Sequence, residues 1–167
     1  VAQNILEVRP TIALVVPRFL EKIHSRVMEK MGAASPIRRN LFTWAVQTGI
    51  EAMPYHLTND PLPLGLKLRH AIADSLVLSK LRDRLGGRIR YFVSGAAPLG
   101  QYLAEFFCAV GIPICEAYGL TETSPVVTAN HLGQIRLGTV GKVIPNVEVK
   151  IADDGEILVR GPNVMRG

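Results

Sequence analysis

Two short turns rich in small residues hold the side chains of this sequence that are best suited to chemistry. The first turn is Ser94–Pro98, with the sequence SGAAP, and the second is Tyr118–Pro125, with the sequence YGLTETSP. Glycine and alanine in both turns allow a flat ligand to approach the backbone closely. The second turn adds a tyrosine ring for stacking and threonine hydroxyls for hydrogen bonding. We name these segments the Gly95 turn and the Tyr118 loop.

The Tyr118 loop also carries one acidic side chain. The carboxylate of Glu122 is a hard oxygen ligand of the kind that Mg²⁺ prefers. A stacking ring, hydroxyls and a carboxylate within Tyr118–Glu122 together predict a nucleotide site. The Gly95 turn, taken alone, is also explained as a plain connection between a strand and a helix.

The surrounding residues predict a strand–helix–strand unit that positions both turns. Arg88–Val93 is predicted to be a strand, Leu99–Val110 a helix and Ile112–Cys115 a second strand. This order implies parallel neighbouring strands joined by a right-handed crossover. Both turns then follow carboxyl ends of strands, and open α/β sheets bind ligands at that edge.

Upstream residues predict one more strand and a long helical region. Thr11–Val16 is apolar and β-branched, which predicts a buried strand. Pro17 then begins an amphipathic helix that ends at Gly32. From about Ala33 to Ser79 the pattern is helical and basic, apart from a loop at His56–Pro63, and we interpret it as a helical insertion between two strands. Its last helix carries an apolar stripe at Leu64, Leu68, Ile72 and Leu76.

Beyond Pro125 the apolar periodicity falls toward two. Val147–Ile151 alternates apolar with charged residues, and Asp154-Gly155 suits the tight turn before Ile157–Arg160. The predicted fold class is therefore α/β. Residues 1–138 form a partial parallel sheet with covering helices, and residues 139–167 begin a β-rich subdomain, a distorted barrel.

Composition and charge exclude several classes of protein. The chain is 48% hydrophobic and 20% charged, with a mean hydropathy of +0.22, so it is globular rather than disordered. Its longest apolar stretch, Ile12–Val16, is far shorter than the ~20 residues that span a bilayer. Fourteen Lys and Arg against seven Asp and Glu lie up to Arg90, but without interleaved aromatic residues we expect no nucleic-acid partner.

The two cysteines do not form a metal or disulfide pattern. Cys108 and Cys115 have neither the spacing of a metal site nor the density of a disulfide framework. We expect buried thiols in a reduced cytoplasm.

The Tyr118 loop resembles the adenine- and magnesium-binding signature of the adenylate-forming, or AMP-binding, superfamily. SGAAPL at Ser94–Leu99 is similar to the preceding adenine-pocket turn of that family. LGTVGKVIPNVEVKI at Leu137–Ile151 and GEILVRGPNVMRG at Gly155–Gly167 are similar to the next two family segments, in order and spacing. VVPRFLEKIHSRV at Val15–Val27, followed by the helical insertion, resembles the long-chain fatty acyl branch.

This resemblance implies a role for each matching residue. Tyr118 stacks on adenine, Thr121 hydrogen-bonds the α-phosphate, and Glu122 binds Mg²⁺, which makes the last two the implied catalytic residues. Gly95, Ala96 and Ala97 line the other face of the nucleotide and the mouth of an acyl tunnel. The remaining implied contacts with the adenine edge and the backbone are Glu116, Ala117 and Gly119.

The resemblance also implies a two-step reaction. A fatty acid carboxylate attacks the α-phosphate of ATP to give an acyl-adenylate and pyrophosphate, and the thiol of CoA then displaces AMP. The implied cofactors are ATP/AMP, Mg²⁺ and CoA, and the implied location is the cytoplasm, with peripheral membrane contact left open. Two alternatives are an adenylation domain for a medium-chain, aryl or amino acid, and a non-catalytic nucleotide-binding module.

Several family segments have no counterpart in this sequence. These are the phosphate loop ending in Pro-Lys-Gly, the ribose-binding aspartate, the hinge and the C-terminal lysine. We therefore expect an internal fragment of a long-chain fatty acid–CoA ligase that is inactive alone and self-associates. Among the histidines, His24, His56 and His70 are interpreted as structural or solvated, and His131 is the candidate that approaches the acyl or CoA side.

Overall fold

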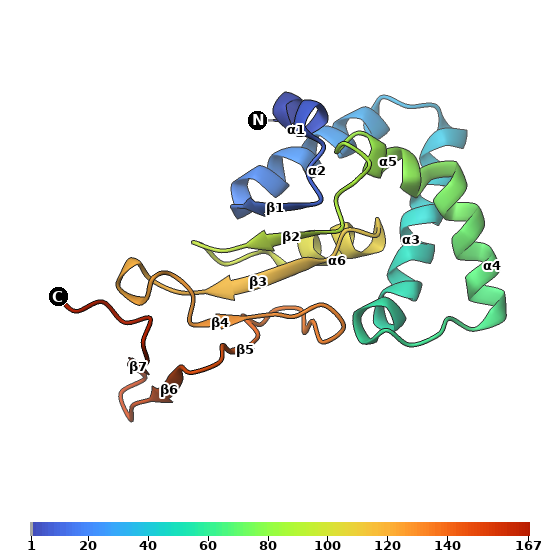
Figure 1. Cartoon of the computed structure of the whole chain (residues 1–167). Coiled ribbons are helices and arrows are strands. Elements are labelled where there is room, and N and C mark those ends of the chain that lie inside the picture. The colour runs from blue at the N-terminus through green and yellow to red at the C-terminus, as the bar shows by residue number, and fades with distance from the viewer. Residues whose placement is uncertain (1) are drawn as a thin grey trace.

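The computed structural model describes the backbone of residues 2–167 and the side chains of residues 4–167. Figure 1 shows a sheet with helices packed around one end and a hairpin at the other. The helices are α1 (Ala2–Val8), α2 (Pro17–Gly32), α3 (Pro36–Thr58), α4 (Leu64–Ala73), a π-helical segment (Asp74–Leu78), α5 (Ser79–Asp83), α6 (Gln101–Ala109) and a 3-10 turn (Thr121–Thr123). The strands are β1 (Ile12–Val15), β2 (Tyr91–Ser94), β3 (Ile114–Tyr118), β4 (Thr128–Ala129), β5 (Lys142–Val143), β6 (Glu148–Ile151) and β7 (Ile157–Arg160).

The main sheet has five strands in the order β1-β2-β3-β4-β5. β1, β2 and β3 are parallel, with Val15 beside Ser94 and Ser94 beside Glu116. The predicted α/β class and the predicted parallel pair are thus confirmed. β3 begins and ends later than expected, at Ile114–Tyr118, because its second half is paired with β4.

Helices α2 to α5 connect β1 to its neighbour β2, and the region interpreted as an insertion lies within this connection. The loop predicted at His56–Pro63 begins too early, since α3 continues through Pro54 to Thr58. Pro54 lies on an exposed part of the helix, and α3 ends where Asn59 adopts a left-handed conformation with φ of 60°. None of the helices described is long and apolar enough to cross a membrane.

The core lies between the sheet and α6. The inner side of α6 buries Leu103, Phe106 and Phe107, as the spacing predicts. Phe92 of β2 meets Phe107 edge to face, with ring centroids 5.9 Å apart. Met28 of α2 is apolar but 45% exposed, so it lies outside the face of α2 that packs against the core.

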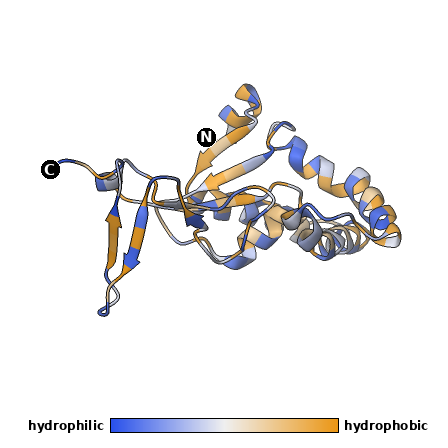
Figure 2. Cartoon of the chain, turned by 60° about the horizontal axis from the view of Figure 1, so that its bottom comes forward, coloured by the Kyte–Doolittle hydropathy of each residue, from blue (hydrophilic) through white to orange (hydrophobic). Residues whose placement is uncertain are grey.

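The last third of the chain forms two further pairings. β5 pairs with β4, so the main sheet continues past residue 139. β6 and β7 form the predicted hairpin, with Glu148 beside Arg160 and a turn at Gly155, whose φ is 90°. Figure 2 shows this hairpin standing out from the main sheet. The subdomain boundary at residue 139 stays a prediction.

Helices α3 and α6 approach each other closely at Gly49. A Cβ atom at this position would lie 2.3 Å from the carbonyl oxygen of Ala109. That distance is far below a van der Waals contact, so the two backbones pack together only because residue 49 has no side chain.

We predict that Gly49→Ala destabilises the fold by about 1–3 kcal/mol, because the methyl group forces the two helices apart. The matched control is Gly65→Ala in α4, where an added Cβ meets nothing within 4 Å. This control should change the free energy of unfolding by less than about 0.5 kcal/mol, because Gly65 lies in the first turn of α4 and not in the helix interior. Urea denaturation measures both changes, and equal effects would contradict the close approach.

Candidate functional site

The Gly95 turn and the Tyr118 loop lie at the same edge of the sheet. β2 and β3 are parallel, and Ser94, the last residue of β2, pairs with Glu116 near the end of β3. A Cβ atom at Gly95 would lie 3.4 Å from the carbonyl oxygen of Ala117. The two segments are therefore adjacent, and the expectation that they share one edge is confirmed.

The Gly95 turn has an unusual backbone. Ala96 has a φ of +69°, in the left-handed region that favours glycine. Such a conformation costs on the order of 1 kcal/mol or more for a residue with a Cβ atom. Ala96 and Ala97 are exposed, so the turn presents a fixed backbone and two methyl groups at the edge of the sheet.

The Tyr118 loop is fixed from inside by Thr123. This side chain is buried, and its Oγ1 accepts a hydrogen bond from the N–H of Leu120 at 2.9 Å. The same hydroxyl lies 3.0 Å from the carbonyl oxygen of Leu120 and 3.1 Å from that of Pro125. Burial of Thr123 leaves Thr121 and Glu122 exposed on the outside of the short 3-10 turn.

A segment some forty residues downstream holds the loop from outside. The side-chain amide of Asn163 donates hydrogen bonds to the carbonyl oxygens of Thr123 and Val126, both at 3.0 Å. The backbone N–H of Met165 donates to the carbonyl oxygen of Glu122 at 2.8 Å. The sequence analysis missed Asn163, and a long-range contact of this kind leaves no local pattern that would reveal it.

Glu116 is buried directly below the loop. Only 9% of the residue is exposed, and this burial raises the pKa of its carboxyl group. The backbone N–H groups of Leu99 and Gly138 nearby partly offset the shift. The carboxyl group thus lies close to the start of the α6 segment and to the loop before β5.

Unused hydrogen-bonding capacity is concentrated at this edge. Among the described side chains, the buried polar atoms without a partner are Ser94 Oγ, Thr128 Oγ1 and Asn163 Oδ1. Ser94 precedes Gly95, Thr128 pairs with Tyr118, and Asn163 binds the loop. Buried polar atoms are rarely left unpaired, so their gathering here distinguishes this edge from the rest of the chain.

The residues present fit a magnesium ion that arrives with a nucleotide. Among the described residues, no group of three or more His, Cys, Asp or Glu side chains could hold a metal ion. The exposed carboxylate of Glu122 offers one oxygen ligand beside the hydroxyl of Thr121. Mg²⁺ commonly takes one or two carboxylates and completes its shell with water and substrate phosphates.

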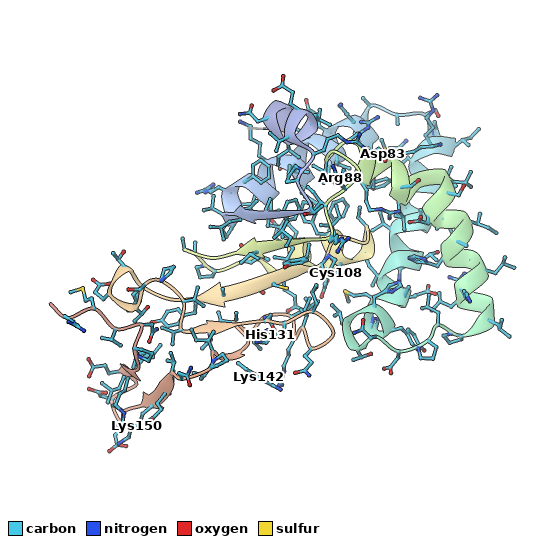
Figure 3. All side chains as sticks on the ribbon, viewed as in Figure 1. Asp83, Arg88, Cys108, His131, Lys142 and Lys150 are labelled. Carbon is cyan, nitrogen blue, oxygen red and sulfur yellow. The ribbon has the colours of Figure 1, made fainter. Side chains whose placement is uncertain are left out.

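The histidines lie away from the Gly95 turn and the Tyr118 loop. His24 contacts Phe106 and Tyr102, with ring centroids 4.8 and 5.6 Å away, and its burial lowers its pKa. α2 therefore turns His24 toward α6, which agrees with a structural role for this residue. His131 follows β4, beside Lys142 and toward the amino end of β3, so it does not face the Tyr118 loop (Figure 3).

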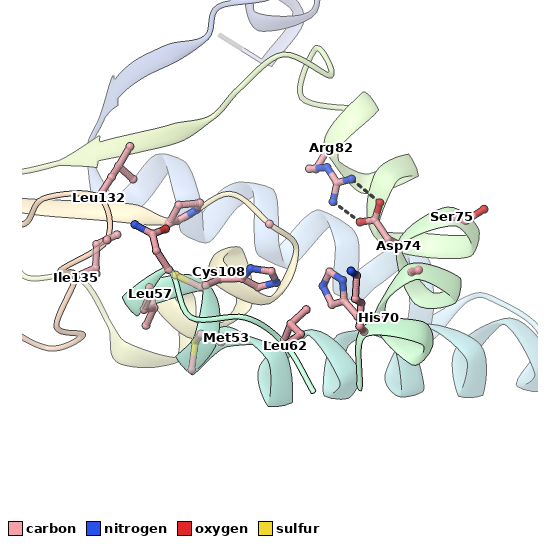
Figure 4. Close-up of a pocket in the computed structure, with 17 residues that line it drawn as sticks. Met53, Leu57, Leu62, His70, Asp74, Ser75, Arg82, Cys108, Leu132 and Ile135 are labelled. Atoms are coloured by element: carbon pink, nitrogen blue, oxygen red, sulfur yellow. Dashed lines mark hydrogen bonds and ion pairs between the residues drawn. The ribbon is translucent and has the colours of Figure 1, made fainter. Parts of the chain in front are cut away.

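A separate cavity of about 680 Å³ lies beyond the amino end of β3 (Figure 4). His56 and His70 line it, with ring centroids 5.1 Å apart. Arg82 donates to both carboxylate oxygens of Asp74, at 2.6 and 2.9 Å, and also to the carbonyl oxygen of Val110 at 2.9 Å. These bonds hold the pKa of Asp74 below its usual range and brace the insertion against α6.

Known proteins are similar to the chain along its whole length. Residues 1–167 match the family described as AMP-binding enzyme. FadD11 of Mycobacterium tuberculosis, assigned by name to the fatty-acid–CoA ligases, is 42% identical over 100% of this chain. Long-chain-fatty-acid–CoA ligase FadD15 of Mycobacterium bovis is 41% identical over 95% of the chain, and peroxisomal long chain acyl-CoA synthetase 6 of Arabidopsis thaliana is 32% identical over 98%. The chain spans 30%, 26% and 24% of these three relatives, respectively.

Solved structures share the fold. A malonyl-CoA ligase in a ternary product complex with methylmalonyl-CoA and AMP is 26% identical, with a TM-score of 0.52, over 98% of this chain and 27% of that structure. A benzoate CoA ligase from Burkholderia xenovorans LB400 is 20% identical, with a TM-score of 0.56, over 97% of this chain and 25% of that structure.

We predict that Glu116 makes the fold less stable as pH rises. Folding raises the pKa of this carboxyl group above its ordinary value of 4.5. Its contribution to the free energy of unfolding is therefore fully present below pH 4.5 and is lost as pH rises through the higher pKa of the folded state. Glu116→Gln cannot ionise, so its stability relative to the parent chain should improve between about pH 4 and pH 7. Urea denaturation at several pH values measures this, and a stability difference that is constant with pH would contradict the raised pKa.

Proposed function

Because the chain belongs to the AMP-binding enzyme family along its whole length, we propose that it forms the adenylate-binding part of an AMP-forming long-chain fatty acid–CoA ligase. The observation that carries this proposal is the common sheet edge at which the Gly95 turn and the Tyr118 loop meet. The names of FadD15 and of the Arabidopsis synthetase, at 41% and 32% identity, support the long-chain substrate, and the name of FadD11 supports a fatty acid.

In the proposed reaction, a fatty acid carboxylate attacks the α-phosphate of ATP, and pyrophosphate leaves. The thiol of CoA then attacks the acyl-adenylate, and AMP leaves. The ring of Tyr118 offers a stacking face for adenine, and the backbone of Gly95, Ala96 and Ala97 lies beside it on the neighbouring strand end. Glu116 and Ala117 border the adenine edge, and Gly119 contacts the nucleotide through its backbone. Residue 119 has no side chain because a Cβ atom there would overlap the carbonyl oxygen of Pro125.

The other residues of the Tyr118 loop act on the phosphates. We assign the hydroxyl of Thr121 as donor to the α-phosphate, and Glu122 as the carboxylate that holds Mg²⁺. The bound ion neutralises phosphate charge. The chain contributes a loop whose shape is fixed before substrate arrives, by Thr123 from inside and Asn163 from outside. Groups that are positioned in advance are the largest source of electrostatic stabilisation in many enzymes.

Two alternatives differ in substrate and in activity. A medium-chain, aryl or amino acid could replace the fatty acid, since malonyl-CoA and benzoate CoA ligases have the same fold. The long helical connection between β1 and β2 and the relatives favour the long-chain acid. A non-catalytic nucleotide-binding module would bind ATP without releasing pyrophosphate. The 167-residue chain spans 24–30% of the length of the relatives, and we expect that it does not catalyse acyl-CoA formation alone.

We predict that Glu122→Gln in the longer parent protein lowers the rate of acyl-adenylate formation by roughly 10²-fold or more, because the amide lacks the charge that Mg²⁺ prefers. Palmitate-dependent release of pyrophosphate from ATP measures this rate. The matched control is Glu156→Gln, an exposed glutamate next to the β6–β7 turn, which should leave the rate unchanged. Equal rates for both variants at limiting Mg²⁺ would remove Glu122 from the metal site.

We also propose that the isolated chain self-associates through β1, the edge strand of the sheet. Ile12, Leu14 and Val16 are 48%, 81% and 50% exposed there. An unpaired edge with exposed apolar side chains favours association. Leu14→Lys should shift the chain toward monomer in light scattering, and Leu132→Lys, at an exposed leucine outside the sheet, should not. If the unmutated 167-residue chain is monomeric at all concentrations, this proposal is contradicted.

A further inference from the structure

Another cavity, of about 480 Å³, lies between the end of β4, the loop that follows it and the start of β5. We name it the Arg136 cavity. Figure 3 shows two of the residues around it, His131 and Lys142, beside each other. Its volume falls in the range of about 300–1,000 Å³ that is typical of small-molecule sites. Its polar lining residues are Asn130, His131, Gln134, Arg136, Thr139 and Lys142.

Hydrogen bonds of a buried side chain fix the walls of this cavity. Asn130 is only 5% exposed, and its side-chain amide donates to the carbonyl oxygen of Thr139 at 2.6 Å. Its side-chain oxygen accepts a hydrogen bond from the backbone N–H of Arg136 at 3.1 Å. Gly141 lies so close to β4 that a Cβ atom there would overlap the carbonyl group of Ala129. The loop is therefore held in one shape by the chain itself.

The positive charge of the cavity is not balanced by acidic side chains. Among the described residues, neither Arg136 nor Lys142 forms an ion pair. No Asp or Glu occurs between Glu122 and Glu148, and Glu116 of β3 lies near Gly138 but does not line the cavity. An anion in the cavity would thus meet cationic side chains without a competing carboxylate.

The neutral polar groups of the cavity indicate what else the anion carries. The Nζ of Lys142 donates to the side-chain oxygen of Gln134 at 3.0 Å, which holds the ammonium group in place. The amide of Gln134 and the hydroxyl of Thr139 can pair with hydroxyl groups of a ligand.

We propose that the Arg136 cavity binds a phosphate ester of a small hydroxylated molecule. The planar guanidinium of Arg136 can donate to two phosphate oxygens at once, and the ammonium of Lys142 adds a compact positive charge. No carboxylate lines the cavity, so a cationic ligand would have no charged partner there.

This site is separate from the proposed adenylate site. β4 runs antiparallel to β3, with Thr128 beside Tyr118 and Ala129 beside Ala117. The loop after β4 therefore leads toward the amino end of β3, whereas the Tyr118 loop follows its carboxyl end. The proposal does not rest on the proposed ligase activity, and either can fail without the other.

The test is isothermal titration calorimetry of the 167-residue chain with glucose 6-phosphate, which lacks the adenine expected at the Tyr118 loop. We expect saturable binding of this probe, weaker binding of inorganic phosphate and no binding of glucose. Arg136→Ala and Lys142→Ala should each weaken binding about tenfold or more, because each loses a hydrogen bond to a charged group. Arg136→Lys should weaken it less than Arg136→Ala, because the charge remains while the planar fork is lost.

Lys150→Ala is the matched control, because Lys150 is an exposed lysine of β6 outside the cavity (Figure 3). Its affinity for glucose 6-phosphate should equal that of the unmutated chain. Arg136 and Lys142 are exposed as well, so circular dichroism should show the same secondary structure in all variants. Three results would each overturn the proposal: no saturable binding, equal losses for Lys150→Ala and Lys142→Ala, or equal affinities for inorganic phosphate and glucose 6-phosphate.

A second arm repeats the titration with the longer parent protein. Binding that depends on Arg136 and Lys142 there supports a site of the whole protein. If the 167-residue chain binds glucose 6-phosphate but the longer protein does not, another segment covers the cavity, and the proposal is overturned.

Discussion

Phe92 and Phe107 meet edge to face beneath the sheet, and the arrangement of the candidate site depends on this contact. Both rings are almost fully buried, and their centroids lie 5.9 Å apart. The contact fixes α6 across β2 and β3, which keeps the two strands parallel and adjacent. Parallel neighbours end at the same edge, so the Gly95 turn and the Tyr118 loop are brought together by apolar packing that lies well away from them. Packing of the core thus positions the two strand ends, and the polar residues of the site only fix the conformation of the loops that follow them.

Sequence patterns predicted the elements whose signals are local. β1, α2, α6 and the β6–β7 hairpin each have a periodicity or a turn residue within a few positions, and all four are present. The end of α3 is misplaced because the Asn, Asp and Pro residues of His56–Pro63 indicate a loop, whereas the helix ends only where Asn59 adopts a left-handed conformation. β4 and β5 have two residues each and exist only through pairing with distant segments, so no periodicity reveals them. Helical spacing identified the apolar residues of α4 but not the side that they face: Leu64 and Leu68 are exposed in the structure. Spacing alone does not say what a helix face packs against.

The candidate site divides into exposed groups and buried supports, and the sequence treats these differently. Thr121 and Glu122 were identified because their residue types are suited to phosphate and metal, and the structure leaves both exposed. Glu116 was assigned to the adenine edge from resemblance, and the structure adds that its side chain is buried, which raises the pKa of the carboxyl group. Thr123 and Asn163 act by shaping the backbone of the loop, which is a task that many residue types share. Residue type therefore identifies the groups that face a ligand better than those that hold them.

The bonds from Asn163 to the Tyr118 loop span up to forty residues, and this separation has a consequence during synthesis of the chain. A ribosome adds about 5–20 residues per second, so the Tyr118 loop is synthesised roughly two to eight seconds before Asn163. During that interval the strands and α6 can already associate, while the loop lacks two of the donors that fix its carbonyl oxygens. The residues of the apolar layer around α6 are therefore available for packing before the segment that holds the Tyr118 loop from outside has been synthesised. The order of the segments along the chain thus separates packing of the core from fixation of the loop in time.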